Sequence, residues 1–296
     1  MSDQDLAYDL HVTPAARTST TRARVLTVER GASRSRSDRL ATEEPLEIRV
    51  LAGGERRTVA VTMRTPGADF ELAAGFLYGE GVVGSREEIG QISYCVDREL
   101  SEEQRYNVVN VALRREQLPD LSSLERHFYT TSACGVCGKA SIESLQLRCP
   151  APLPAGPVVP AEALFQLPDA LRAEQGLFAT TGGLHAAALF EPSPGGEMRL
   201  LALREDVGRH NALDKLVGWA LLQGRLPLHQ ALVMVSGRAS YEIMQKCLAA
   251  GAPIVCAVSA PSSLAVDVAR AFGMTLVGFL RGERFNVYAG AERIAR

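Results

Sequence analysis

The last third of the 296-residue chain alternates short apolar segments with longer amphipathic ones, and this alternation limits the possible folds more than any other feature. The apolar segments have the length of strands, and the segments between them have the length and period of helices. The predicted strands are 231–236, 253–259 and 275–280, and the predicted helices are 208–222, 240–251 and 262–273. Apolar strands joined by helices form a parallel sheet that helices cover on both faces. We therefore expect an α/β fold in this part of the chain.

The first part of the chain has a different pattern. Residues 24–64 form short segments in which apolar and polar side chains alternate, and Gly53-Gly54 marks a hairpin turn between two of them. A helical period follows at 68–83, and the strand pattern returns at 91–96 and 106–113. These elements predict a smaller, sheet-rich α+β unit.

Composition suggests where the domains divide. Residues 1–22 are polar and without hydrophobic period, which predicts a disordered N-terminal tail. We expect a β-rich α+β subdomain at 23–127 and an α/β domain at 128–296. Within the second domain, the proline-rich segment 150–160 predicts a connector. A helix is predicted at 160–175, followed by strands near 184–190 and 197–204.

The charge balance and the cysteine content exclude several classes of protein. The chain has 32 Lys and Arg against 34 Asp and Glu, and a net charge of −2 argues against a broad nucleic-acid surface. No apolar run reaches the roughly 18 residues of a membrane span, and the acidic N-terminus lacks the order of a signal peptide. Six cysteines are too few for a disulfide scaffold. We expect a cytoplasmic protein with no membrane or nucleic-acid partner.

Arginine and lysine are unevenly used. Seven arginines lie in residues 17–39, which predicts either a solvated arm or a docking segment for an acidic partner. The only lysines are Lys139, Lys215 and Lys246, and all three lie in segments that are rich in polar motifs. An ammonium group and a guanidinium group differ in size and shape. We therefore expect Lys→Arg at these positions to impair the function of the surrounding motifs more than the stability of the fold.

The pair Cys134 and Cys137, in the segment CGVCGKAS, carries the clearest chemical signal. A CxxC pair at the start of a helix favours the thiolate, which is the reactive form in nucleophilic attack, sulfur transfer and metal binding. Four interpretations remain open on the residues alone: a structural zinc site, a dithiol oxidoreductase, a buried pair, and a persulfide carrier. The other cysteines are predicted to be structural, and they are Cys95, Cys149, Cys247 and Cys256.

Polar side chains gather where the predicted strands end. The segment REDVGRHNALDK places Asp206, Arg209 and His210 at the start of a helix, where an anion meets free N–H groups. In α/β sheets, ligands bind at the carboxyl ends of strands. The other candidates in such positions are His185, Ser236, Arg238, Ser262, Arg281 and Arg284. Together they predict a polyphosphate or nucleotide pocket, although the chain has no P-loop and no GxGxxG motif.

Five segments occur together and in order: CGVCGKAS, EDVGRHNALDK, SGRASYEI, SAPSSLAVDVA and GFLRGERFNVY. In this combination the chain resembles the formate dehydrogenase accessory sulfurtransferase family (FdhD) over roughly residues 24–290. The resemblance implies a cytidine-deaminase-like three-layer α/β sandwich with a smaller β-rich part, and a homodimer. It also implies that a cysteine desulfurase delivers persulfide sulfur to the CxxC loop. The sulfur then passes to the molybdenum (or tungsten) bis-molybdopterin guanine dinucleotide cofactor before formate dehydrogenase receives that cofactor.

The resemblance assigns roles to individual positions. Cys134 is expected to carry the persulfide, and Cys137 to be its partner. The residues expected to contact the cofactor are Phe279, Leu280, Arg281, Gly282, Glu283 and Arg284. The molybdenum or tungsten cofactor is then a substrate that the protein binds for a time. We expect no permanently bound cofactor and no metal-ligand residues. Asp206 and Glu242 are both candidates for reading guanine.

Two alternatives stand beside the sulfurtransferase. One is a zinc-dependent hydrolase of a nucleotide-like substrate, which a deaminase-like fold would suit. The HxE and PCxxC signature of deaminases is absent, however. The other is a chaperone that binds the cofactor without moving sulfur.

Overall fold

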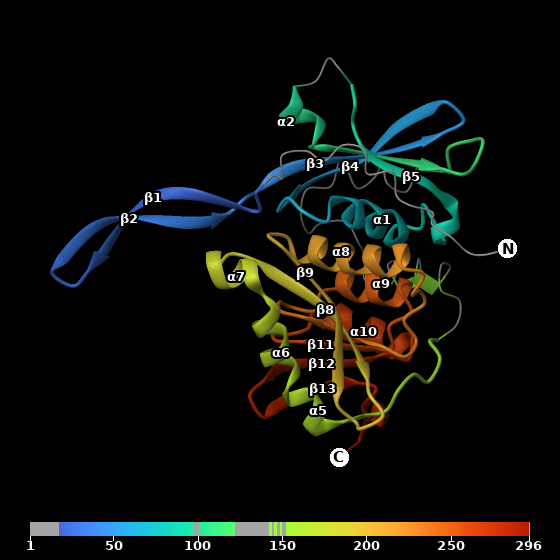
Figure 1. Ribbon diagram of the computed structural model, residues 1–296. Coiled ribbons are helices and arrows are strands. Elements are labelled where there is room, and N and C mark those ends of the chain that lie inside the picture. The colour runs from blue at the N-terminus through green and yellow to red at the C-terminus, as the bar shows by residue number, and fades with distance from the viewer. Residues whose placement is uncertain are drawn as a thin grey trace.

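The computed structural model describes residues 18–97, 101–121, 142–143, 145–146, 149 and 152–295 (Figure 1). The Cys134–Cys137 pair and the tail before residue 18 lie outside the described residues. Two sheets dominate the molecule: a six-stranded sheet built from the second half of the chain, and a four-stranded sheet built from the first.

The six-stranded sheet has the order β13-β12-β11-β10-β8-β9. Its strands are β8 (His185–Pro192), β9 (Met198–Asp206), β10 (Leu232–Val235), β11 (Ile254–Ala257), β12 (Thr275–Arg281) and β13 (Arg284–Ala289). Strands β10, β11 and β12 are parallel as predicted, whereas β8, β9 and β13 pair antiparallel with their neighbours. The sheet is therefore mixed, and only its centre has the predicted parallel arrangement.

Helices cover both faces of this sheet. One face carries α8 (Arg209–Leu222), α9 (Tyr241–Ala249) and α10 (Ser263–Ala271), and the other carries α5 (Ala161–Phe165) and α6 (Leu167–Glu174). Successive strand residues alternate between the two cores: Val233 and Val255 pack in one, and Met234 and Cys256 pack in the other. This α/β/α layering confirms the predicted α/β fold class.

The segment before β8 differs from its prediction. The single helix predicted at 160–175 is two helices, because the chain breaks at Gln166 and Pro168 stands in the first turn of α6. A further short helix, α7 (Gly176–Thr181), follows. Strands β7 (Val159–Pro160) and β14 (Ile294–Ala295) pair as a small separate sheet next to the C-terminus. A 3-10 turn, η2 (Ala291–Arg293), leads into β14.

The four-stranded sheet has the order β4-β3-β6-β5 and packs one face on helix α1 (Asp69–Gly79). Its strands are β3 (Glu44–Ala52), β4 (Glu55–Arg64), β5 (Ile89–Tyr94) and β6 (Val108–Leu113). Gly53 and Gly54 both have positive φ and form the predicted hairpin turn. The short elements η1 (Arg86–Glu88) and α2 (Glu102–Arg105) stand beside β5.

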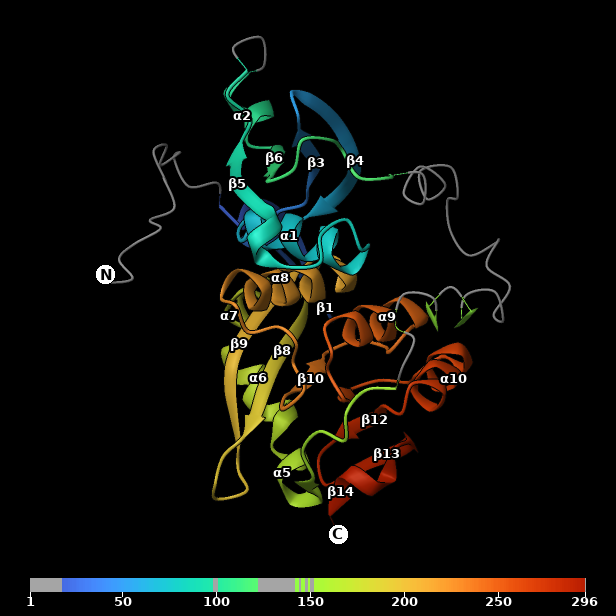
Figure 2. The ribbon, with the colours of Figure 1, turned by 90° about the vertical axis from the view of Figure 1, so that its right-hand side faces the viewer.

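Helices α1 and α8 lie against each other and join the two parts of the molecule (Figure 2). Their backbones come very close at two glycines. A Cβ atom added to Gly75 would lie 1.9 Å from the carbonyl oxygen of Asp214, and one added to Gly218 would lie 1.8 Å from that of Glu71. Only glycine allows two helices to approach to this distance.

A buried polar cluster lies beside this crossing. Nζ of Lys215 pairs with Oδ2 of Asp206 at 2.7 Å and donates a hydrogen bond to the carbonyl oxygen of Thr65 at 2.8 Å. Asp206 also accepts the backbone N–H of Thr65. Asn211 donates to the carbonyl oxygen of Met63 at 2.7 Å. Since Thr65 and Met63 belong to the first part of the chain, the cluster fixes it against the start of α8.

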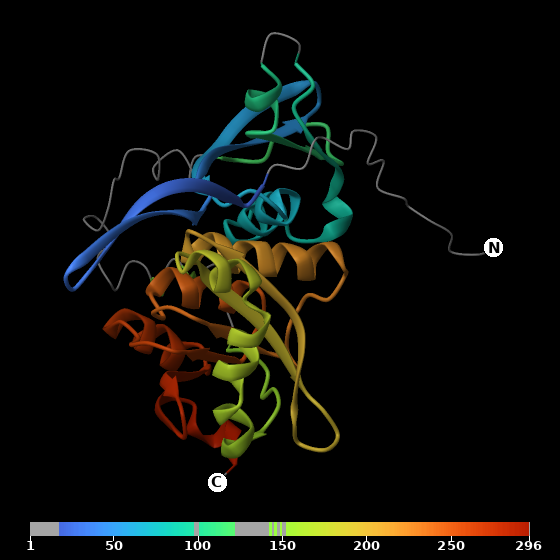
Figure 3. The ribbon, with the colours of Figure 1, turned by 60° about the vertical axis from the view of Figure 1, so that its left-hand side comes forward.

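Strands β1 (Thr20–Glu29) and β2 (Ala32–Ala41) form a separate two-stranded ribbon that extends from the body of the protein (Figures 1 and 3). Strand β1 starts at Thr20, so the last residues of the predicted disordered tail, Thr20 to Arg22, are in fact paired in a strand. The described part of the arginine-rich segment 17–39 lies in this ribbon, which we call the arm.

Candidate functional site at the strand ends

The candidate site lies at the edge of the large sheet where the parallel strands end. Because β8 runs antiparallel to β10, its first residue lies at this edge, and the last residue of β9 lies beside it. His185 accordingly pairs with Asp206 across β8 and β9. The backbone N–H of Ala186 donates to Oγ of Ser236 at 2.8 Å, which links the start of β8 to the loop after β10.

The loops that follow β10 and β11 and the end of β12 are connected by backbone hydrogen bonds. The N–H of Ser262 donates to the carbonyl oxygen of Ala239 at 2.9 Å, and the N–H of Phe279 donates to that of Ser259 at 3.1 Å. Ala239 also forms a parallel bridge with Pro261. Three predicted strand-end segments therefore form one continuous rim.

Gly237 brings two predicted site residues together. A Cβ atom at this position would lie 3.3 Å from Nδ1 of His185 and 3.9 Å from Cδ of Arg209. Both side chains therefore lie within van der Waals range of one loop. Gly237 is not among the predicted site residues, although a glycine directly after a predicted strand is a recognisable signal for close approach.

The site is electropositive. The pKa of His185 lies below its usual value because the ring is partly buried and because Arg209 and Arg238 are near. Burial and the Arg209 guanidinium lower the pKa of His210 to about 4. Nε of Arg209 is buried and has no hydrogen-bond partner within the described residues. Such a group would gain most from an anionic ligand.

His210 lies beside residues of the next loop and of α9. Its Nε2 is 3.4 Å from Oγ of Ser240 and 3.9 Å from a carboxylate oxygen of Glu242. With a pKa of about 4, the imidazole is neutral near pH 7 and acts as a hydrogen-bonding group, so the arginines supply the positive charge of the site.

This assignment predicts a pH dependence of stability. The folded state lowers the pKa of His210 from 6.5 to about 4, so protonation favours the unfolded chain. The folded state, which keeps His210 neutral, has its full stability above pH 6.5 and loses part of it as the pH falls toward 4. We expect the unfolding free energy of the wild type to fall relative to that of His210→Gln over this range, as measured by urea denaturation. A constant difference would contradict the assignment.

The turn between β12 and β13 completes the rim. Phe279 has a φ of +53°, which is uncommon for a residue with a side chain, and the guanidinium of Arg281 lies 5.7 Å from the centre of its ring. Arg281, Gly282, Glu283 and Arg284 are exposed. From its sequence this segment is expected at the carboxyl end of a strand, and it forms a hairpin turn there, since Arg284 already starts β13.

Three predicted site residues have local structural roles. The side chain of Leu280 is fully buried in the sheet core, so only its backbone can face a ligand. Oγ of Ser262 accepts the N–H of Ala265 and caps α10. The hydroxyl of Ser236 accepts the N–H of Ala186.

The two carboxylates that were candidates for reading guanine differ in accessibility. Asp206 is fully buried, and its oxygens are occupied by Thr65, Gly208, Asn211 and Lys215. It therefore cannot contact guanine, and this part of the sequence-based expectation is wrong. The side chain of Glu242 is 56% exposed and remains a candidate.

The lysines also have a different role from the one expected. Lys215 and Lys246 are buried, and Nζ of each lies 2.7 Å from a carboxylate, that of Asp206 or Asp214. Buried ion pairs of this kind are first of all structural. Lys→Arg at these two positions should therefore disturb stability. Lys139 lies outside the described residues.

Two of the described cysteines are structural, as predicted, because their side chains are fully buried. Cys247 and Cys256 are fully buried, and burial raises the pKa of both thiols, that of Cys247 to about 12. Thiols with such pKa values are unreactive near pH 7. Within the described part of the chain, no three His, Cys, Asp or Glu side chains gather into a possible metal site. Nor does that part contain a helix long and apolar enough to cross a membrane.

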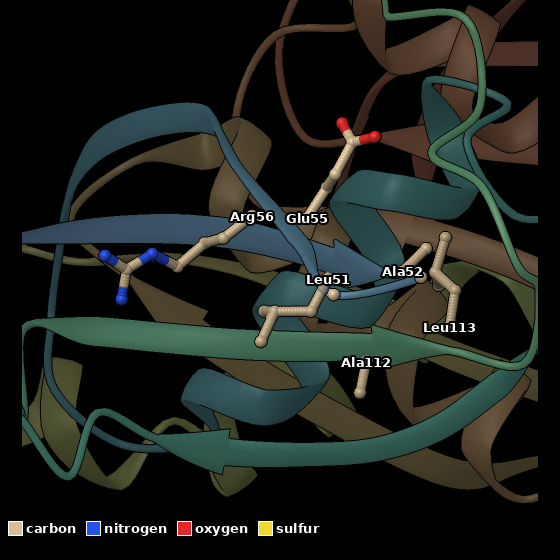
Figure 4. Close-up of a pocket in the computed structure, with 8 residues that line it drawn as sticks. Leu51, Ala52, Glu55, Arg56, Ala112 and Leu113 are labelled. Carbon is tan, nitrogen blue, oxygen red and sulfur yellow. The ribbon is translucent and has the colours of Figure 1, made fainter.

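A pocket of 710 Å³ lies elsewhere, at the turn between β3 and β4 (Figure 4). It is lined by Leu51, Ala52, Gly53, Gly54, Glu55, Arg56, Ala112 and Leu113. The charged side chains of Glu55 and Arg56 point away from each other, so they do not converge on a ligand. Its described lining includes no histidine, cysteine or serine. The strand ends are therefore the better candidate for chemistry.

Comparison with known proteins agrees with this architecture. The model of the FdhD/NarQ family matches residues 41–295. The sulfur carrier protein FdhD of Streptomyces avermitilis is 52% identical over 93% of this chain and 96% of its own length. Its counterpart in Mycobacterium tuberculosis is 52% identical over 88% of this chain and 93% of its own length.

A crystal structure from Desulfotalea psychrophila, of a protein assigned as a formate dehydrogenase accessory protein, has the same fold. It superimposes with a TM-score of 0.71 at 27% identity and covers 94% of this chain and all of the other. The sequence match spans the strand-end rim as well as the cores of both sheets. The chain therefore belongs to the FdhD/NarQ family.

Proposed function

We propose that the chain is a sulfurtransferase that serves formate dehydrogenase. In this proposal Cys134 accepts persulfide sulfur from a cysteine desulfurase. The sulfur then passes to the molybdenum or tungsten bis-molybdopterin guanine dinucleotide cofactor before the cofactor enters the dehydrogenase. The names of the relatives, sulfur carrier protein and formate dehydrogenase accessory protein, support the proposal. The observation that carries it is the convergence of His185, Arg209, His210 and the Phe279–Arg284 turn on one rim.

The rim suits the phosphates of the cofactor, which is a bound substrate in this proposal. Arg209 offers a buried Nε without a described partner, next to the N-terminus of the 14-residue helix α8. Arg281 and Arg284 are exposed on the turn and can each pair with a phosphate oxygen. The exposed Glu242 can accept the two N–H groups of a guanine edge. These groups recognise both parts of a guanine nucleotide.

The sulfur step follows from thiolate chemistry. The Cys134 thiolate attacks the terminal sulfur of the donor's persulfide, the S–S bond of the donor breaks, and the donor cysteine leaves as a thiolate. No net oxidation occurs, and Cys134 now carries the persulfide. Cys137 can then attack Sγ of Cys134, which forms a disulfide and releases the outer sulfur as hydrosulfide to the cofactor, and an external dithiol reduces the disulfide before the next cycle. The CxxC spacing suits the second step, because cysteines at this spacing commonly form a disulfide with each other.

Activation of formate dehydrogenase tests the proposal. In cells that lack their own copy of this protein, wild type should restore formate dehydrogenase activity. Cys134→Ser should leave it at background, because serine cannot hold a sulfane sulfur. Cys149→Ser, a matched change outside the CxxC pair, should restore activity as wild type does. Full activity with Cys134→Ser would contradict the proposal and favour a chaperone that moves no sulfur.

A further inference from the structure

The arm formed by β1 and β2 has two faces of different chemistry. Cross-strand neighbours in an antiparallel pair share a face, so the register of the two strands assigns each side chain. The open face carries Arg22, Arg24, Leu26 and Val28 on β1, and Ser33, Ser35, Ser37 and Arg39 on β2. The paired face carries Val25, Thr27 and Glu29 on β1, and Arg34, Arg36, Asp38 and Leu40 on β2.

On the paired face the charges are balanced within the arm. Arg34 lies 3.4 Å from Glu29, and Arg36 lies 3.1 Å from Asp38 and donates a hydrogen bond to Thr27 at 2.8 Å. Val25 and Thr27 on this face are partly buried. The long arginine side chains therefore find partners on the arm itself.

The open face has no such balance. It carries three arginines and no carboxylate, and no ion pair joins Arg22, Arg24 or Arg39 to any residue in the described part of the chain. Leu26 is 66% exposed and Val28 is 73% exposed, directly beyond Arg24 on the same face. Basic groups bordering exposed apolar side chains match a partner surface that is acidic and partly apolar.

The arm is rooted next to the strand-end rim. Strand β2 packs against α7. The Cβ of Ala41, at the end of β2, is 4.0 Å from the Cβ position of Gly183, two residues before His185. At the same end Ser19 donates to the carbonyl oxygen of Pro66 at 2.8 Å. A partner protein that binds along the whole open face, from its tip to its root, therefore also reaches the rim.

We infer that the open face of the arm docks an acidic surface of the protein that receives the cofactor, the apo-formate dehydrogenase, and holds it beside the rim. The inference rests on the proposed function, because the rim is then the place where the cofactor is handed over. A second copy of this chain cannot present its own open face to the arm, since two basic faces repel each other. Nucleic acid fits less well, because a phosphate backbone leaves Leu26 and Val28 exposed to water.

Binding of the purified full-length chain to purified apo-formate dehydrogenase tests the inference by biolayer interferometry. Arg22→Ser/Arg24→Ser should raise Kd about tenfold at low salt, because two charged contacts at the interface are lost. The control Arg34→Ser/Arg36→Ser removes the same charge from the paired face of the same hairpin and should change Kd less than about twofold. Leu26→Ser should weaken binding, and Leu40→Ser, on the paired face, should not.

Three results would overturn the inference. Equal effects of the two arginine pairs would show that only net charge matters, and no effect of either would show that the arm does not dock the dehydrogenase. Loss of binding to the cysteine desulfurase alone would assign the arm to the sulfur donor instead. Persulfide loading of Cys134 should be unchanged in all four variants. If wild type itself takes up no sulfur, the proposed function fails. The binding data then test the docking inference separately.

Discussion

Replacing Gly218 with alanine is expected to lower the free energy of unfolding by about 3 kcal/mol or more, since overpacking a tight core contact costs this much when the backbone must move. The new methyl group would lie 1.8 Å from the carbonyl oxygen of Glu71, well inside contact distance. The obstacle is backbone in helix α1, so no side-chain rotation relieves it. The two helices would have to separate, and with them the two parts of the molecule.

Gly176→Ala is the matched control for this prediction. Gly176 also lies in a helix, but a Cβ atom there would meet nothing within 4 Å. Alanine is a better helix former than glycine by up to about 1 kcal/mol, so this variant should be neutral or slightly stabilised. Urea denaturation followed by circular dichroism measures both. Equal stability of Gly218→Ala and wild type would show that α1 and α8 do not cross as described.

The second large effect is expected at the buried pair of Lys215 and Asp206. Lys215→Met keeps the length of the side chain but leaves the Asp206 carboxylate buried without its cation, and this costs about 3–5 kcal/mol. Lys215 is 2% exposed and Asp206 is fully buried, so water cannot replace the lost partner. The hydrogen bond from Lys215 to Thr65 is lost as well, which loosens the first part of the chain from the start of α8.

An exposed ion pair provides the comparison. Arg199 pairs with Glu191 at 3.2 Å, and the Arg199 side chain is 67% exposed. Arg199→Met should therefore change the unfolding free energy by less than about 1 kcal/mol. Chemical denaturation of the two variants under the same conditions measures the contrast. A Lys215→Met variant as stable as Arg199→Met would mean that the cluster does not join the two parts of the chain.

The central strands and helices could be predicted from the sequence because their periods are unambiguous. Residues 231–235 are apolar throughout, and strand β10 lies there with all four residues buried. The hairpin of β12 and β13 could not be recognised in the same way. Its Arg281-Gly282-Glu283-Arg284 turn has the composition of a strand-to-helix loop, and only pairing with β12 shows that Arg284 begins a strand. Pairing partners are not encoded in a local pattern.

The candidate site shows the same limit. Motifs brought His185, Arg209 and Arg238 to attention, and the antiparallel entry of β8 explains why they meet. Burial could not be predicted, however. In the sequence, Asp206 lies in a polar motif that is typical of a ligand-binding site. In the structure, four partners from both parts of the chain enclose its carboxylate. Its role depends on contacts with Thr65, which is more than a hundred residues away along the chain.

Intact-mass spectrometry of the purified chain tests the central claim most directly. After incubation with a cysteine desulfurase and cysteine, wild type should gain the mass of one sulfur atom, about 32 Da, in a form that a reducing thiol removes. Cys134→Ala should gain nothing, whereas Cys149→Ala should load as wild type does. An unchanged mass of the wild type, or a full adduct on Cys134→Ala, would contradict the account.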